Sequence, residues 1–391
     1  MNEMNNELIC LSVPNFQGNE KKYVDQAVDE EWVSTAGPFI ASFEKNMAET
    51  MGVPQACACQ SGTAGLHLCL RHFGIGENDI VLVPTLTFIA PINAVVYQNA
   101  TPVFFDCDEN LCIDAKQVEE YLREQCVVRD GHTVEKDSGK TVKAILPVHV
   151  FGDHCDMDSL MALAAEFGLI VIEDATEAVG GHFAKGAYAG KAIGTGGHAG
   201  VLSFNGNKII TTGGGGMVLS NDAPTVEHIR YLSQQAKDDT LYFVHGEVGY
   251  NYRMTNLQAA LGLAQLEELP GFVDIKKKNY LRYCELLRDC RYASMLPFGS
   301  GNSSNHWFYS FALHEADPGK RDRLIRYMND QQIQVRPIWK LNHTQNMFRR
   351  YKAMPCPRAA DYYDRVINIP CSTNLTEAQQ DRVCDALLKF C

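Results

Sequence analysis

The sequence has no excess of positive charge. It carries 35 Lys and Arg against 47 Asp and Glu, which gives a formal net charge of −12 at pH 7. Proteins that bind nucleic acid usually present a basic face, so we expect no nucleic-acid partner. The balance leaves room for a local site that binds a phosphorylated small molecule.

The sequence also lacks long hydrophobic runs. No window approaches the 18 uninterrupted apolar residues that are typical of a transmembrane helix. The first residues, MNEMNNELICLSVPNF, contain no basic region followed by a long apolar stretch, so no signal peptide is expected. We therefore predict a cytoplasmic protein with no membrane partner.

Cysteine is not scarce, but a metal-ligand spacing is missing. The 14 cysteines are scattered along the chain, and the CAC sequence at 57–59 has no matching second pair. Without a secretion signal, such thiols are expected to be reduced residues of the core. The sequence therefore predicts no metal site.

Two phosphate-binding motifs are incomplete. In SFNGNKIITTGGGG at 203–216, Lys208 lies among glycines, but a P-loop needs Gly before the lysine, Ser or Thr after it, and then a helix. Asn207 and Ile209 occupy those two positions. GTGGHA at 194–199 matches part of a dinucleotide-binding pattern, but it runs into the strand-like GVLSF. Neither fragment predicts its usual ligand.

Short apolar segments alternate with amphipathic helical segments between residues 55 and 175. This alternation predicts a mainly parallel sheet with helices on both faces. The carboxyl ends of parallel strands meet at one edge, where ligands bind. We expect an α/β domain over residues 1–270 and a smaller C-terminal α+β domain over residues 271–391.

Four local features are also predicted. Residues 127–142 are polar and turn-rich, which indicates a surface hairpin or loop. The runs GVLSF and GGMVLS, between 199 and 220, indicate a short antiparallel pair. The stretch from 251 to 289 predicts one long helix, kinked or broken at Pro270. The three lysines at 276–278 are expected on a solvated helix face.

Lys208 offers a third chemistry, which is attack on an aldehyde carbon. An amine attacks a carbonyl only when it is unprotonated, and burial or a nearby positive centre favours that form. An aldehyde cofactor such as pyridoxal phosphate also needs N–H groups for its phosphate, a carboxylate for its ring nitrogen and an apolar face for its ring. The competing interpretation makes Lys208 a surface charge beside a turn.

Candidates for each of these roles follow predicted strands. SGTA at 61–64 starts a helix, so it meets a phosphate or forms a plain strand–helix turn. Asp174 ends a buried strand, where it pairs with a ring nitrogen or caps a helix. Phe88 stacks on the ring or packs in the core. Ser203 precedes Lys208 and is a further donor to the phosphate.

Six motifs, in this order along most of the chain, resemble the DegT/DnrJ/StrS-type sugar aminotransferases. These are pyridoxal-phosphate enzymes with the aspartate-aminotransferase-like fold (fold type I). The resemblance implies that fold, that cofactor in the large domain, and a homodimer with shared active sites. The motifs are SGTAGLHL, PTLTFIAPINAV, PVHVFG, IEDATEAVG, SFNGNK and GYNYRMTNLQAALG.

The resemblance assigns roles to individual positions. Lys208 matches the lysine that holds pyridoxal 5'-phosphate covalently, and Asp174 matches the partner of the ring nitrogen; these are the two expected catalytic residues. Asn251 and Arg253 match a loop that reaches the neighbouring subunit's phosphate. Glu177 is a departure, because most relatives have Gln beside the cofactor's phenolic oxygen; a carboxylate there is repelled unless it is protonated or contacts something else. The expected cofactor-binding residues are Ser61, Gly62, Thr63, Ala64, Phe88, Asp174, Glu177, Ser203, Asn205, Lys208, Asn251 and Arg253.

A finer resemblance concerns the substrate. The segments at 30–40, 303–311, 335–343 and 367–375 are similar to the branch that makes 4-amino-4,6-dideoxy-N-acetylglucosamine nucleotides for bacillosamine and legionaminic acid. Trp307 and Phe308 are expected in the core, and His149 and His154 are expected to be structural. The expected substrate-binding residues are Thr35, Asn305, His306, Arg336 and Trp339.

The implied reaction is transamination with L-glutamate as donor, 2-oxoglutarate as product and pyridoxamine phosphate as the intermediate form of the cofactor. The implied acceptor is UDP-2-acetamido-2,6-dideoxy-4-ketohexose, and the product serves a bacterial surface glycan. A GDP- or dTDP-linked 4-keto or 3-keto sugar is the alternative acceptor. A non-catalytic regulator of the same fold, and a dehydratase or epimerase, are the alternatives to an aminotransferase.

Overall fold

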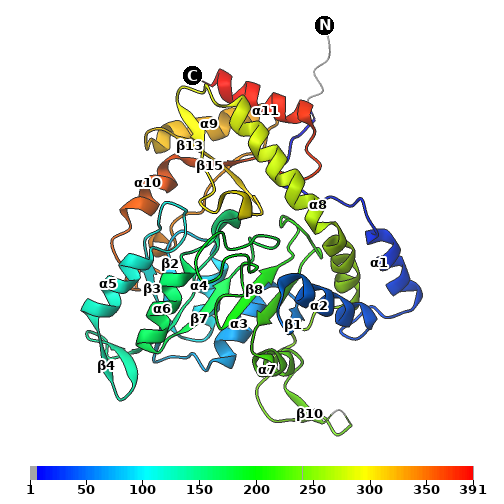
Figure 1. The fold of residues 1–391 in the computed structure, drawn as a ribbon, viewed down its shortest axis with the longest axis vertical. Helices are drawn as coiled ribbons and strands as arrows, with labels where there is room; N and C mark the ends of the chain where they lie inside the picture. Colours follow the sequence, from blue (N-terminus) through cyan, green and yellow to red (C-terminus); the bar gives the residue numbers. More distant parts are fainter. Residues whose placement is uncertain (1–6, 240, 391) are drawn as a thin grey trace.

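The computed structural model describes residues 7–239 and 241–390 of the chain. Its larger part is built on a nine-stranded sheet with strand order β1-β9-β8-β7-β6-β2-β3, to which the β4–β5 hairpin is joined at β6 (Figure 1). Neighbours along β3, β2, β6, β7 and β8 are parallel, whereas β9 is antiparallel to both β8 and β1. The predicted mainly parallel α/β architecture is confirmed. The strands are β1 (Gln55–Cys59), β2 (Asp79–Pro84), β3 (Thr101–Phe105), β4 (Cys126–Arg129), β5 (His132–Glu135), β6 (Thr141–Ile145), β7 (Ile170–Asp174), β8 (Ala199–Ser203) and β9 (Gly216–Ser220).

Three of the helices in this part begin at an aspartate cap. Asp114, Asp156 and Asp222 each accept a backbone N–H with a side-chain oxygen, which satisfies a donor that the first turn leaves free. The helices cover the sheet, so strands such as β7 and β8 are almost entirely buried. The helices up to this point are α1 (Glu20–Asp29), α2 (Pro38–Met51), α3 (Gly62–His72), α4 (Ala90–Tyr97), α5 (Ala115–Gln125), α6 (Met157–Phe167) and α7 (Ala223–Ser233).

A smaller antiparallel sheet, with order β12-β13-β15-β14, lies at the C-terminal end of the chain (Figure 1). The long helix α8 (Asn256–Leu286) leads into it and starts with a capping box between Thr255 and Gln258. Its strands are β12 (Ala293–Met295), β13 (Tyr309–Leu313), β14 (Arg336–Pro337) and β15 (Val366–Ile369), and its helices are α9 (Pro318–Asp330), α10 (Pro357–Arg365) and α11 (Glu377–Lys389).

Helix α8 confirms the single long helix that was predicted and corrects the expectation for the lysine run. It continues through Pro270, so the chain is not broken there. The run of lysines is not a uniformly solvated face either: Lys278 is exposed, but Lys276 is buried, because the run spans more than one side of the helix. The division at residue 270 falls inside α8 and stays a prediction.

Two other local predictions are confirmed. Residues 127–142 contain most of the β4–β5 hairpin, and β8 pairs with β9 in antiparallel register. A second hairpin, formed by β10 (Lys237–Asp239) and β11 (Val244–His245), projects from the body of the molecule (Figure 1). In the described residues, no helix is both long and apolar enough to span a membrane.

Candidate active site

The carboxyl ends of the parallel strands open into a cavity of about 500 Å³. Segments after β1, β2, β6, β7 and β8 line one side of it, as the parallel topology requires. The N-terminal segment, the residues before β13, and β14 and β15 supply the other side. The cavity therefore lies where the large sheet meets the C-terminal part of the chain.

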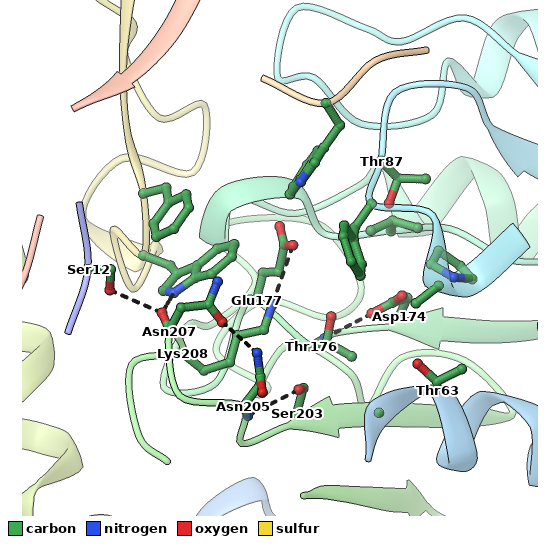
Figure 2. Close-up of a pocket in the computed structure, with 18 of the residues that line it drawn as sticks. Ser12, Thr63, Thr87, Asp174, Thr176, Glu177, Ser203, Asn205, Asn207 and Lys208 are labelled. Atoms are coloured by element: carbon green, nitrogen blue, oxygen red, sulfur yellow. Dashed lines mark hydrogen bonds and ion pairs between the residues drawn. The ribbon is translucent and has the colours of Figure 1, made fainter. Parts of the chain in front are cut away.

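Lys208 points into this cavity from the turn that follows β8 (Figure 2). Its backbone N–H donates to the Asn205 carbonyl at 2.9 Å, which closes the turn. Its side chain is only 12% exposed. The Nζ atom lies 3.9 Å from the centre of the Trp307 ring and 3.5 Å from Glu177 Oε1. The interpretation of Lys208 as a solvated surface charge is therefore wrong.

Asp174 is the last residue of β7 and lies at the bottom of the same cavity. Its Oδ1 accepts the backbone N–H of Thr176 at 3.1 Å. Residues 175–198 contain no helix, so Asp174 is not the cap of one. Burial raises the pKa of Asp174, while Thr176 and the positive charge of Lys208 lower it. A cationic ring N–H beside Asp174 would favour its ionised form.

The start of α3 forms one corner of the cavity. Ser61 is the N-cap, and its Oγ accepts the Ala64 N–H at 3.0 Å. A Cβ on Gly62 would lie 2.8 Å from Thr176 Cγ2 and 3.2 Å from Ser203 Cβ, so only glycine lets these segments approach so closely. Thr63 and Ser203 line the same corner. Free N–H groups and the helix dipole make such a corner suitable for a phosphate.

Hydrogen bonds that involve Phe151 and Asn305 hold Glu177 beside Lys208. Its Oε2 accepts the backbone N–H of Phe151 at 2.8 Å, and Phe151 has a left-handed backbone with φ of 55°. The Asn305 amide donates to the carbonyls of Glu177 and Val179 from below. Burial raises the pKa of Glu177 to about 7, against the lowering effect of Lys208. The neutral carboxyl form is therefore accessible near neutral pH.

Aromatic side chains form the walls. Phe88 is 52% exposed at the cavity, so it is not an ordinary core residue. Its ring centre lies 6.5 Å from that of Trp339, which packs on Phe151 at 4.6 Å. Trp307 and Phe308 are buried in the core, as expected, and both also line the cavity.

The cavity unites most of the predicted cofactor residues. The predicted residues that line it are Ser61, Gly62, Thr63, Phe88, Asp174, Glu177, Ser203, Asn205, Lys208, Arg336 and Trp339. Ala64 lies just behind the corner.

Besides Ala64, five predicted residues do not line this cavity. Thr35 and Asn251 are exposed elsewhere, and Arg253 forms an ion pair with Glu44 of its own chain at 2.5 Å. Asn305 is buried under the Glu177 turn. His306 is also buried, and burial lowers its pKa to about 4.

The two other histidines have structural partners. His149 Nε2 lies 2.8 Å from Glu173 Oε2, and His154 Nε2 accepts the Ala184 N–H at 3.2 Å. This agrees with their interpretation as satisfied structural residues. In the described ranges, no group of three or more His, Cys, Asp or Glu residues could hold a metal ion.

Several residues of the cavity have no local signal in the sequence. Ser12 Oγ donates to the Asn207 carbonyl at 3.1 Å, and Leu11 N–H donates to Gln334 Oε1 at 3.0 Å. These contacts join segments that are about 200 and 320 residues apart. The additional polar residues that line the cavity are Ser12, Thr87, Thr176, Asn207, Gln334 and Asn368.

Comparisons with known proteins agree with this geometry. The sequence model of the DegT/DnrJ/EryC1/StrS aminotransferase family matches residues 14–388. EpsN of Bacillus subtilis, described as a pyridoxal phosphate-dependent aminotransferase, is 35% identical over 97% of this chain and 95% of its own. GDP-perosamine synthase of Caulobacter vibrioides is 37% identical over 97% of both chains. The structure of DesI with its TDP-sugar product covers 98% of this chain and 93% of its own, with 27% identity and a TM-score of 0.85.

Proposed function

The chain belongs to the DegT/DnrJ/EryC1/StrS aminotransferase family, and on that basis we propose that it transfers an amino group from L-glutamate to C4 of a nucleotide-linked 4-keto-6-deoxy sugar. The observation that carries the proposal is one cavity that unites a shielded lysine, a buried carboxylate and a helix N-terminus. Lys208, Asp174 and Ser61 represent these three groups.

The residues of the cavity fit pyridoxal phosphate, on which the family depends. The corner at Ser61, Gly62 and Ser203 suits the phosphate, and buried Asp174 suits a protonated ring nitrogen. When bound, the cofactor supplies an aldehyde carbon that takes the amino group and a ring that accepts negative charge. Lys208 is the residue that would hold it covalently.

The side chains of the cavity have separate roles in the proposed reaction. Lys208 Nζ takes a proton from the α-carbon of L-glutamate and later gives one back to the acceptor sugar's C4, as a general base and acid. Asp174 keeps a positive charge on the ring nitrogen. Glu177 lies within 3.5 Å of Lys208 Nζ and can hold a proton near neutral pH. The walls at Trp307 and Phe308 exclude water from the reacting atoms.

Two nucleotides are candidates for the acceptor. Relatives described as GDP-perosamine synthases, 37% and 36% identical to this chain, support a GDP-linked sugar. The motifs at 303–311 and 335–343 support UDP-2-acetamido-2,6-dideoxy-4-ketohexose and a place in bacillosamine or legionaminic acid synthesis. In either case Arg336 and Trp339, which line the cavity at β14 and just after it, are suited to the nucleotide or sugar.

The proposal includes a homodimer. Asn251 and Arg253 do not line the cavity of their own chain, as expected of residues that act on a neighbouring subunit. The nearby β10–β11 hairpin carries the exposed side chains of Leu241, Tyr242 and Phe243. Such an apolar cluster favours contact with another protein surface.

An amination assay tests this function. Purified protein with pyridoxal phosphate and L-glutamate is offered UDP-, GDP- and dTDP-linked 4-keto sugars in parallel. The expected result is one amino sugar formed per 2-oxoglutarate released, with one nucleotide preferred. Cofactor binding without amination of any sugar would favour a regulator instead, and a sugar product without 2-oxoglutarate would favour a dehydratase or epimerase.

A further inference from the structure

Lys276 is a buried lysine at the joint between α8 and the C-terminal sheet. It is 2% exposed, and its Nζ donates to the carbonyl oxygens of Trp307, at 2.8 Å, and of Cys371. Within residues 7–239 and 241–390, no carboxylate forms an ion pair with this ammonium group. Its near neighbour Lys278 is exposed and lies 3.6 Å from Glu377.

Such a position is costly for a lysine. An ammonium group that leaves water loses hydration, and two carbonyl dipoles replace it only in part. Burial lowers the pKa of Lys276 and raises the pKa of the Cys371 thiol, which is therefore neutral at physiological pH. The other groups nearby are the Tyr309 ring, at 5.6 Å, and the His306 imidazole, whose pKa is low. None of them supplies a negative charge at neutral pH.

The first carbonyl belongs to one wall of the active-site cavity. Trp307 places its ring 3.9 Å from Lys208 Nζ, and its indole N–H donates to the Asn207 carbonyl at 2.7 Å. The hydrogen bond from Lys276 fixes the backbone from which this ring projects. The Lys276 ammonium group therefore contacts the backbone of the residue whose indole lies over Lys208.

The second carbonyl leads to a neighbouring wall on the same side of the cavity, the N-terminal segment of residues 9–13. Cys371 N–H donates to the Leu11 carbonyl at 2.8 Å, and Ser372 Oγ accepts the Val13 N–H at 3.0 Å. Ser12, between these two anchors, donates to the same Asn207 carbonyl that the indole contacts. The two walls are thus linked at two places. Beside Lys208 both donate to the Asn207 carbonyl. Away from the cavity, Lys276 donates to the carbonyls of Trp307 and of Cys371, the residue that binds the N-terminal segment.

We propose that Lys276 is a positioning residue that holds the Trp307 wall and the N-terminal segment together over Lys208. It does so through hydrogen bonds from one charged donor to two backbone carbonyls, which are stronger than neutral ones. The phosphate corner at Ser61 and the carboxylate of Asp174 both lie at the ends of strands of the large sheet and do not depend on this link. Lys276 therefore governs the substrate side of the cavity and leaves the cofactor side unchanged. The assignment of this side to the substrate rests on the proposed function. The claim that Lys276 keeps the two wall segments ordered does not.

Hydrogen exchange in the full-length, cofactor-free protein tests the link directly. Lys276→Met keeps the chain length but removes both hydrogen bonds, and Lys276→Gln is a milder change that keeps N–H donors on a shorter chain. Lys278→Met and Lys278→Gln make the same changes at an exposed position of the same helix. The amides to follow are those of Leu11, Val13, Trp307 and Cys371.

We expect exchange at both walls to rise by about tenfold or more in each Lys276 variant, which corresponds to local opening. The Lys278 variants are expected to exchange like the wild type, and β7 and β8 are expected to stay protected in all four. Wild-type exchange at either wall in Lys276→Gln, or in Lys276→Met, would overturn the proposal.

A binding measurement separates the proposal from the function. In Lys276→Met, the affinity for pyridoxal phosphate is expected to stay within about twofold of the wild type, while KM for the accepted nucleotide sugar rises about tenfold. An equal loss of affinity for pyridoxal phosphate and for the nucleotide sugar would contradict the proposed role. A KM equal to that of the wild type would contradict it as well. If no nucleotide sugar is accepted at all, the proposed function fails, but the exchange result still decides the role of Lys276.

Discussion

Glu177 is the single residue whose chemistry most depends on its surroundings. A carboxylate beside a phenolic oxygen is unfavourable when both are ionised. The structure gives Glu177 two partners, the Lys208 ammonium and the Phe151 N–H, and a pKa of about 7. The sequence identified this position as a departure from its relatives, but only the fold shows what the side chain contacts.

The first prediction concerns the pH dependence that Glu177 confers. Its folded pKa of about 7 lies above the ordinary 4.5, so the native state binds a proton that the unfolded state releases. The associated stability is full below pH 4.5 and is lost as the pH rises towards 7, by about 3 kcal/mol at 1.36 kcal/mol per unit. Glu177→Gln cannot titrate and lacks this loss.

Urea unfolding of the cofactor-free protein at pH 4.5 and pH 8 measures this pH-dependent loss of stability. The change in unfolding free energy between the two pH values is expected to differ by about 3 kcal/mol between wild type and Glu177→Gln. The same change in both proteins would show that Glu177 has an ordinary pKa.

Asp174 gives the second prediction. Asp174→Asn keeps the shape and the hydrogen bond to Thr176 but removes the negative charge. The rate of the reaction with L-glutamate is expected to fall on the order of 10²- to 10³-fold, the usual cost of losing one electrostatic group at a reacting centre. Stopped-flow absorbance after mixing with L-glutamate measures this rate. Retention of cofactor binding is the control, and an unchanged rate would remove Asp174 from the mechanism.

The elements of the fold explain why the site could be located from sequence. The segments that line one side of the cavity follow β1, β2, β6, β7 and β8, and the alternation of strands and helices predicted that the ends of such strands would meet. SGTA at 61–64 and IEDAT at 172–176 were recognisable because strand-end chemistry is local. The opposite wall was not, because Leu11, Trp307 and Asn368 meet only through tertiary packing.

Helix α3 supplies the third prediction. In Gly62→Ala, the new Cβ meets Thr176 Cγ2 at 2.8 Å, which spreads the corner where a phosphate is expected. Alanine favours a helix over glycine by about 1 kcal/mol, so the cost should appear more in cofactor affinity than in overall stability. We expect affinity for pyridoxal phosphate to fall by about tenfold or more, since each tenfold step is 1.4 kcal/mol of lost contact.

Gly76→Ala is the matched control, because a Cβ at Gly76 has no neighbour within 4 Å. Absorbance titration of both variants with pyridoxal phosphate gives the comparison. If Gly62→Ala binds as tightly as Gly76→Ala, the phosphate does not lie at this corner.

At the scale of the whole molecule, the large sheet was predicted from the sequence, whereas the burial of Lys276 at the joint after it was not. Buried alternating strands leave a strong pattern in sequence. The joint does not: α8 continues past Pro270, and the buried Lys276 looked like part of a solvated run. A charged side chain in a core is decided by partners such as the Trp307 and Cys371 carbonyls, which no local pattern reveals.

The projecting hairpin gives the fourth prediction, for assembly. Leu241 and Phe243 are 73% and 69% exposed, and the proposed dimer would bury such side chains. The double variant Leu241→Ser and Phe243→Ser is expected to shift the protein from dimer towards monomer in sedimentation velocity, with a loss of activity. Val128→Ser, at an exposed position of β4, is the control. A wild-type protein that sediments as a monomer would contradict shared active sites.

The most direct test is to locate the cofactor chemically. The protein is incubated with pyridoxal phosphate, reduced with borohydride, digested, and its peptides are weighed by mass spectrometry. The account predicts that the pyridoxyl group is on the ε-nitrogen of Lys208. In Lys208→Ala, no peptide from the cavity is expected to carry a pyridoxyl group. A label that is found on other lysines while Lys208 remains unmodified would contradict it.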